Sequence, residues 1–291
     1  MELQWPLILF TTLVAWSAGI FGAQGVLALK GAGRKAQLPA LIASLVTLCI
    51  GGIAVFFHLQ HWERIFNGFG HITSGITQEL IAIVVMVVLM VAYFVMLRKS
   101  GNGTVPKWCA VCAAVIAVVL AAVCAHSYMM PARPAWNSVL EVLSIVGAAC
   151  VLGPATVAVI MAVAGDDVAA VGTPALVGAV IGAVCAVAYA VFLQVSGGSF
   201  VEVGNYFDPT HPTKAMVDAA AVAGGQAVLL WLGAVVVGAV VPLACCLLAK
   251  RKADAASWKI FGSVAVVAAL AGAICLRIAF YNMGLSVFMF Y

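Results

Sequence analysis

"LIAIVVMVVLMVAYFVML" occupies residues 80–97 and contains no charged side chain. An uncharged apolar run of about 18 residues is long enough to cross the ~30 Å hydrocarbon core of a bilayer as a helix. Inside lipid the backbone finds no water, so its N–H and C=O groups must be satisfied within the segment. This stretch therefore predicts a transmembrane helix.

The same pattern recurs along the whole chain. Hydrophobic residues make up 65% of its 291 residues and charged residues only 8%, with a mean hydropathy of +1.18. A soluble domain carries about 25% charged residues, so we expect a single integral membrane domain over residues 1–291. The segments are too long and too evenly apolar for barrel strands, which predicts an all-α polytopic protein. The eight predicted spans are roughly 7–29, 38–57, 79–97, 108–128, 138–163, 171–195, 222–249 and 260–284.

Basic residues are distributed unequally between the two sets of loops. Ten of the fourteen Lys and Arg residues fall in the loops after the first, third and seventh predicted spans. Cytoplasmic loops of membrane proteins carry an excess of Lys and Arg. We therefore expect these loops to be cytoplasmic and both termini to lie on the outer side. The net charge is only +4, and we therefore do not expect nucleic acid as a partner.

The stretch "HLQHWERIFNGFGHITSGITQEL", residues 58–80, concentrates ionisable side chains on the expected outer side. His58 ends one span and Glu79 opens the next, with Arg64 between them. Each has a simpler explanation, because an acid suits the first turn of a helix, with Thr77 as N-cap, and a boundary histidine can be an amphipathic anchor. Ionisable groups at a membrane boundary are costly, however, and commonly mark a path for protons or a ligand. Their clustering favours a functional site.

Two other polar features of the spans have structural explanations. Ser138 and Glu141 fit a capping box at the start of the fifth span. Arg277 lies inside the eighth span, and we expect it to pair with a helix carbonyl, Tyr281 or Asn282, since arginine keeps its proton.

Cysteines and histidines give no pattern of a metal site. The nine cysteines lie mostly inside apolar segments and are interpreted as small buried hydrophobic residues. Cys109 and Cys112 form a C-x-x-C, but no second pair has metal-ligand spacing. His58 and His126 both end spans on the outer side, which leaves one haem between them open as an alternative. A transporter is also open, although transporter sites usually lie near mid-membrane, where Arg277 is the one candidate charge.

Three stretches together resemble the membrane anchor subunits of the dimethyl sulfoxide reductase family. The first combines His58-Leu59, Arg64-Ile65-Phe66-Asn67 and Glu79. The second is "PARPAWNSVLE" (131–141), and the third is "WPLILFTTLVAWSAGIFG" (5–22). The resemblance covers essentially the whole chain. Gln60 and Trp62 depart from the Gly and Pro that the family tends to have after His-Leu.

The resemblance implies a multi-pass subunit of a prokaryotic plasma membrane that serves anaerobic respiration. Such an anchor binds menaquinol near the outer face and carries no haem or iron–sulfur cluster itself. It passes electrons to an iron–sulfur subunit docked on its outer face, which feeds a molybdopterin catalytic subunit. Quinol oxidation needs a proton acceptor beside an apolar slot. We expect Glu79, His58 and Arg64 to act on the quinol, and Phe57, Trp62, Phe66 and Asn67 to bind it.

Overall fold

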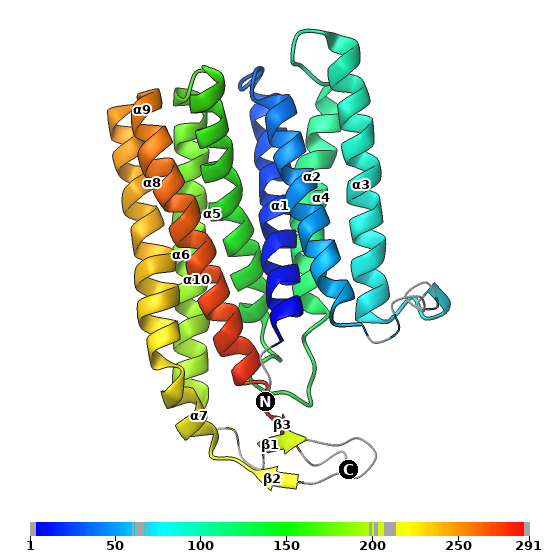
Figure 1. Cartoon of the computed structure of the whole chain (residues 1–291), viewed down its shortest axis with the longest axis vertical. Helices are drawn as coiled ribbons and strands as arrows, with labels where there is room; N and C mark the ends of the chain where they lie inside the picture. The colour runs from blue at the N-terminus through cyan, green and yellow to red at the C-terminus, as the bar shows by residue number, and fades with distance from the viewer. Residues whose placement is uncertain are drawn as a thin grey trace.

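The computed structural model describes residues 4–59, 61, 67, 69–197, 200, 203–206 and 214–287. Eight helical segments among them are long and apolar enough to cross a membrane, so the predicted all-α fold with eight spans is confirmed. The first six are α1 (Trp5–Leu29), α2 (Gln37–Phe56), α3 (Gly75–Ser100), α4 (Lys107–His126), α5 (Val139–Ala164) and α6 (Ala169–Ser196). Figure 1 shows them side by side as one bundle.

The last two spans are composed of several helical pieces. The seventh joins the π-helical segment η3 (Val228–Val240) to α8 (Val241–Lys252). The eighth joins α9 (Ala255–Ser257), η4 (Trp258–Gly262) and α10 (Ser263–Asn282). The seventh span was predicted to begin near residue 222, but a separate short helix, α7 (Ala219–Gly225), precedes it.

A small antiparallel sheet lies beyond one end of the bundle. It contains β1 (Val203–Tyr206), β2 (Lys214–Met216) and β3 (Ser286–Val287) in the order β2-β1-β3. β1 is the central strand, and it pairs with β2 on one edge and with β3, which follows α10, on the other. The sheet therefore joins the segment after α6 to the segment after α10.

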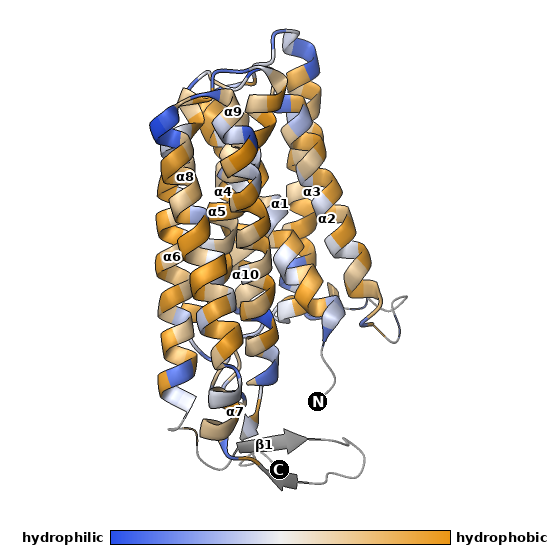
Figure 2. Cartoon of the chain, turned by 60° about the vertical axis from the view of Figure 1, so that its left-hand side comes forward, coloured by the Kyte–Doolittle hydropathy of each residue, from blue (hydrophilic) through white to orange (hydrophobic). Residues whose placement is uncertain are grey.

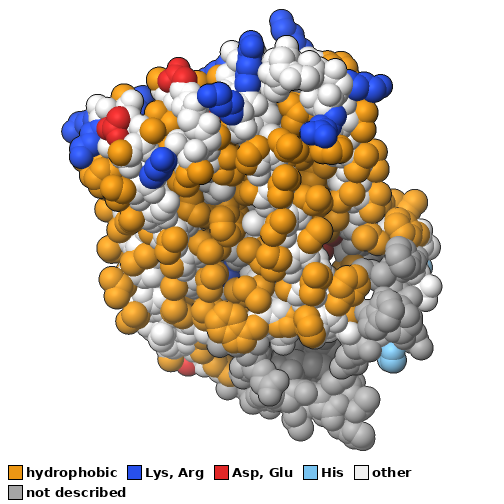
Figure 3. All heavy atoms as spheres, turned by 45° about the horizontal axis from the view of Figure 1, so that its top comes forward, with side chains coloured by type: hydrophobic (Ala, Val, Ile, Leu, Met, Phe, Trp, Pro, Cys, Tyr) orange, Lys and Arg blue, Asp and Glu red, His pale blue; other side chains and the backbone are white. Residues whose placement is uncertain are grey.

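The two ends of the bundle differ in charge. Figure 1 places the start of α1, the end of α10 and the sheet at one end, which we call the terminal end. The loops at the other end, the basic end, carry the Lys and Arg side chains seen at the top of Figure 3. Between the ends the helices are hydrophobic along most of their length, as Figure 2 shows. The Lys and Arg residues of the alternate loops therefore lie together on the surface of the basic end.

A carboxylate joins two of the loops at the basic end. Asp166, in the turn after α5, accepts hydrogen bonds from the backbone N–H groups of Lys35 (2.8 Å) and Ala36 (2.9 Å), next to the start of α2. Gly165 makes this turn possible because its φ of 69° suits a residue without a Cβ. Asp166 therefore connects the turn after α5 to the loop before α2.

Close helix packing depends on glycines that face a neighbouring backbone. A Cβ added to Gly153 of α5 would overlap the backbone of Gly19 on α1. A Cβ on Gly178 of α6 would likewise overlap the carbonyl of Cys150 on α5. Lipid tails are as apolar as the helices, so helices associate in a bilayer through close van der Waals contact, which small residues permit.

We expect Gly153→Ala to lower the thermal stability of the protein in detergent. The added methyl group must push α1 and α5 apart, and overpacking of this kind costs about 1–3 kcal/mol. Gly224→Ala is the matched control, because Gly224 is exposed in α7 and a Cβ there meets no atom within 4 Å. The unfolding temperature should fall for Gly153→Ala only. An equal fall for both variants would contradict the packing role of Gly153.

Candidate functional site

A cavity of about 460 Å³ lies at the terminal end of the bundle. It is enclosed by the start of α1, the end of α2, the start of α3 and the loop that follows α4. Most of its lining is apolar and includes Leu7, Phe10, Val55, Ile83 and Met130. We call it the Glu79 cavity, because Glu79 is the only carboxylate among the described residues that line it.

Glu79 is held inside the protein by its position on α3. It lies one turn beyond Ser74, the N-cap residue, and is only 8% exposed. Thr77, which was predicted to be the N-cap, is instead buried in the first turn. The Ser127 hydroxyl, just past the end of α4, forms a hydrogen bond with Glu79 Oε1. The contact joins α3 to α4 at the cavity wall.

Ser127 can satisfy Glu79 in either of its protonation states. Its hydroxyl also lies 3.0 Å from the carbonyl oxygen of Cys124, in the last turn of α4. The hydroxyl has one hydrogen and two acceptor lone pairs. It donates that hydrogen to an ionised Glu79. When Glu79 is protonated, the carboxyl group donates instead, and the serine hydrogen turns to Cys124. Neither state leaves a polar hydrogen without an acceptor.

The other predicted site residues lie in different places. His58 lines the same cavity and is exposed, so it lies at the rim. Phe57 is 82% exposed and does not line the cavity, whereas the neighbouring Phe56 does. Asn67 is exposed and likewise lies outside the lining. Arg64, Trp62 and Phe66 lie outside the described residues.

The loop between α4 and α5 supplies a wall that the sequence analysis missed. Trp136 and Tyr128 both line the cavity. The Trp136 ring stacks on Phe280 of α10 at 4.5 Å, and its Nε1 donates a 2.7 Å hydrogen bond to the Phe280 carbonyl. The Arg133 guanidinium lies over the Trp136 ring at 4.5 Å and donates a hydrogen bond to the Gly284 carbonyl. The aromatic and proline residues in 129–137 were the feature of the sequence that could have indicated this wall.

Tyr128 contributes a phenol hydroxyl to the cavity. Its ring meets those of Trp136, Phe280 and Tyr281 edge-on, with centroids 6.0–6.1 Å apart. Removal from water, and then the neighbouring Tyr281 and Glu79, raise the pKa of the Tyr128 phenol above its ordinary range. Tyr128 is therefore a neutral group, able to donate or accept a hydrogen bond.

A second polar group lies in the interior between α5 and α10. Arg277 Nη1 lies 2.9 Å from Glu141 Oε1, and Nη2 donates to Ser144 Oγ at 3.2 Å. The two charged residues are 4% and 0% exposed. Arg277 was expected to bond a helix carbonyl, Tyr281 or Asn282, and Glu141 to complete a capping box. Both expectations are wrong, because Arg277 and Glu141 pair with each other. Each buried charge is stabilised by the opposite charge of its partner.

Ser138 alone retains the predicted capping role, since its hydroxyl accepts from Leu140 N at 3.2 Å.

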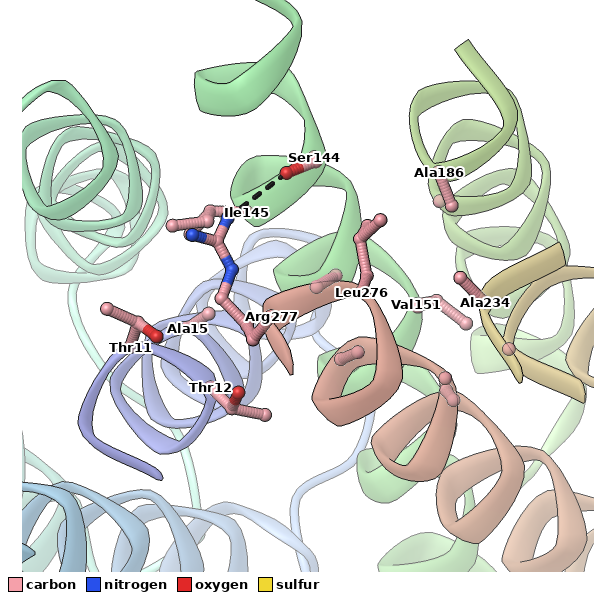
Figure 4. Close-up of a pocket in the computed structure, with 16 residues that line it drawn as sticks. Thr11, Thr12, Ala15, Ser144, Ile145, Val151, Ala186, Ala234, Leu276 and Arg277 are labelled. Atoms are coloured by element: carbon pink, nitrogen blue, oxygen red, sulfur yellow. Dashed lines mark hydrogen bonds between the residues drawn. The ribbon is translucent and has the colours of Figure 1, made fainter. Parts of the chain in front are cut away.

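Beside Arg277 is a small cavity of about 30 Å³, lined also by Thr11 and Thr12 of α1 (Figure 4). The Thr12 hydroxyl is buried there without a hydrogen-bond partner among the described residues. A space of this size and polarity suits a buried water.

Among the described residues, neither cavity is lined by a cysteine or by His126. The described cysteines are all free, with Cys109 buried and Cys112 partly buried in α4. In the part of the chain that the structure describes, no group of three or more His, Cys, Asp or Glu side chains has the arrangement of a metal site. His126 is exposed and does not line the Glu79 cavity.

Arg277→Met should destabilise the protein strongly, because Glu141 would remain buried without its partner. Breaking a buried pair in this way costs about 3–5 kcal/mol, whereas replacing both partners by apolar residues is often close to neutral. We therefore expect the double variant Glu141→Leu/Arg277→Met to unfold at a higher temperature than Arg277→Met in detergent. A double variant as unstable as the single one would show that the ion pair is not the origin of the loss.

A comparison with protein-family models gives a match over almost the whole chain. The family model described as "DMSO reductase anchor subunit (DmsC)" matches residues 1–285. A search of curated proteins found no match. The family match covers all eight membrane spans and both polar sites, and the resemblance noted in the sequence is confirmed. An anchor of this kind is a membrane subunit that associates with the catalytic and electron-transfer subunits of its complex. The chain therefore belongs to the family of DMSO reductase anchor subunits.

Proposed function

We propose that this anchor subunit oxidises menaquinol in the Glu79 cavity and passes the electrons to an iron–sulfur subunit. The observation that carries the proposal is a buried carboxylate, Glu79, in an apolar cavity at one end of the membrane bundle. A quinol needs such a cavity for its ring and a positioned proton acceptor for its hydroxyl groups. Membership of the anchor family supports an electron-transfer role.

The residues of the cavity suit the chemistry of the reaction. Oxidation of a quinol to a quinone breaks two O–H bonds and releases two protons and two electrons. Glu79 accepts one proton, and the Ser127 hydroxyl reverses its hydrogen bond when this happens. His58 lies at the exposed rim, where it passes this proton, and then the second one released through Glu79, to water. The electrons leave toward the iron–sulfur cluster of the partner subunit.

The walls of the cavity position the ring. Phe10, Phe56 and Trp136 provide apolar faces, and the Tyr128 hydroxyl is available to a quinol oxygen. Arg64, Trp62 and Phe66 remain predicted contributors from the loop between α2 and α3. Arg64 would orient a quinol oxygen or stabilise the ionised form of Glu79.

The partner subunits dock at the terminal end in this proposal. The Glu79 cavity lies there, and electrons must leave close to where the quinol binds. Loops 58–79, 129–137 and 196–221 supply the docking surface, and the iron–sulfur subunit connects this surface to a molybdopterin catalytic subunit. The Lys and Arg residues at the opposite end support a cytoplasmic location for that end. The terminal end then faces outward from a prokaryotic plasma membrane.

Glu79→Gln should abolish most quinol oxidation by the purified complex. The substitution keeps the shape of the side chain but removes the proton acceptor, and the loss of a general base costs about 10²- to 10⁴-fold in rate. The measurement is menaquinol-dependent reduction of the terminal acceptor, with binding of a fluorescent quinone-site inhibitor as a second readout.

Asp167→Asn is the control for this experiment. Asp167 lies at the basic end, away from the cavity and the docking surface, and its Oδ1 accepts from Ala169 N at 2.9 Å, a bond that asparagine can also accept. This variant should retain full activity. Unchanged turnover and inhibitor binding in Glu79→Gln would place the quinol site elsewhere.

Turnover should also be electrically silent. Glu79, Glu141, His58 and His126 lie toward the terminal end, and Asp166, Asp167 and Asp254 toward the basic end. No chain of such groups crosses the bilayer within the described residues. A proton pump needs such a chain. Quinol oxidation by the complex in liposomes should therefore leave a potential-sensitive dye unchanged. A dye signal that grows during turnover and collapses with an ionophore would show that charge crosses the membrane.

A further inference from the structure

The walls of the Glu79 cavity differ in exposure. The wall from α1 and the loop after α4 is closed, since Phe10 is 3% and Trp136 7% exposed. The wall from α2 and α3 is open, since Phe56 is 44% and Ile76 60% exposed. These exposed residues are apolar and belong to membrane spans. The cavity therefore opens toward lipid, between the end of α2 and the start of α3.

The lining of the cavity combines a hydrogen-bonded polar pair with apolar side chains. Glu79 and Ser127 form their hydrogen bond between α3 and the end of α4. Val55 and Phe56 of α2, and Ile76 and Ile83 of α3, line the open side. A ligand that fits this arrangement has a polar head near Glu79 and a long apolar tail that extends into the bilayer.

Two adjacent glycines on α2 have different surroundings. A Cβ on Gly51 would lie 3.2 Å from Leu13 Cβ, so Gly51 allows α2 to pack against α1. A Cβ on Gly52 would meet no atom within 4 Å, although Gly52 lines the cavity. Packing between helices explains the first glycine but not the second. The missing side chain at position 52 leaves space at the open side of the cavity.

We propose that Gly52 keeps open a lateral portal between α2 and α3, through which the isoprenoid tail of the quinol enters and remains in the bilayer. The inference rests on the proposed quinol oxidation in the Glu79 cavity. A long-tailed quinol cannot leave the hydrocarbon phase without exposing its tail to water, so it must reach Glu79 from the side. Gly52 then leaves room for the tail of the quinol, while Glu79 accepts a proton from its ring hydroxyl.

The test compares two substrates in the purified complex, a long-tailed menaquinol and the tail-less 2-methyl-1,4-naphthoquinol. Gly52→Phe should lower kcat/KM for the long-tailed quinol about tenfold or more and for the tail-less quinol by less than about threefold. Gly52→Ala should have a smaller effect in the same direction. The control is Ile53→Phe, because Ile53 is 58% exposed and does not line the cavity. Ile53→Phe should leave kcat/KM unchanged for both quinols.

The outcomes separate the portal from the reaction itself. Equal losses for both quinols in Gly52→Phe, or no loss for either, would overturn the portal. Glu79→Gln tests the reaction, since it should remove activity with both quinols whether or not the portal exists. Gly52→Ala carries the test if thermal unfolding shows that Gly52→Phe does not fold. The portal then stands only if Gly52→Ala lowers kcat/KM for the long-tailed quinol more than for the tail-less one.

Discussion

The structure depends on one constraint, which is that a polar group inside a bilayer must find its partner within the protein. The constraint makes each span a helix, because only a helix satisfies the backbone without help from another segment. It also explains where the charged residues lie. Among the described residues, the charged side chains without a buried partner are at the two ends of the bundle, and the buried Glu141 and Arg277 pair with each other through Glu141 Oε1.

Two buried carboxylates illustrate how the same constraint produces different roles. Glu141 faces a permanent cation, Arg277, and the pair joins α5 to α10 as a structural contact. Glu79 meets the hydroxyl of Ser127, which is neutral and can reverse its hydrogen bond. Arg277 can only donate to Glu141, whereas the Ser127 hydroxyl can donate to Glu79 or accept from it, so Glu79 can gain and lose a proton without losing this hydrogen bond. This difference is why the proposed chemistry belongs to Glu79.

The aromatic cluster gives the Glu79 cavity a rigid side. Trp136 is held by the stacked Phe280 ring, by a hydrogen bond to the Phe280 carbonyl and by Arg133. The loop after α4 is thereby attached to the end of α10, although the two are far apart in the chain. The opposite side, at Gly52, has no comparable packing. A cavity with one rigid wall and one open wall suits a ligand that moves between the protein and the lipid.

The sequence by itself determined the eight spans, the division of basic residues between alternate loops and the position of Glu79 near a membrane boundary. These are properties of continuous stretches, because the length of an apolar run and the charge of a loop need no knowledge of neighbouring helices. Only the tertiary structure decided the partners. It paired Arg277 with Glu141 and Glu79 with Ser127, and it placed Phe56 rather than Phe57 in the cavity. The spans are apolar on every face, so the sequence carries no signal for the rotation of one helix against another. That rotation follows from close contacts such as Gly153 against Gly19, and it alone determines which side chains meet.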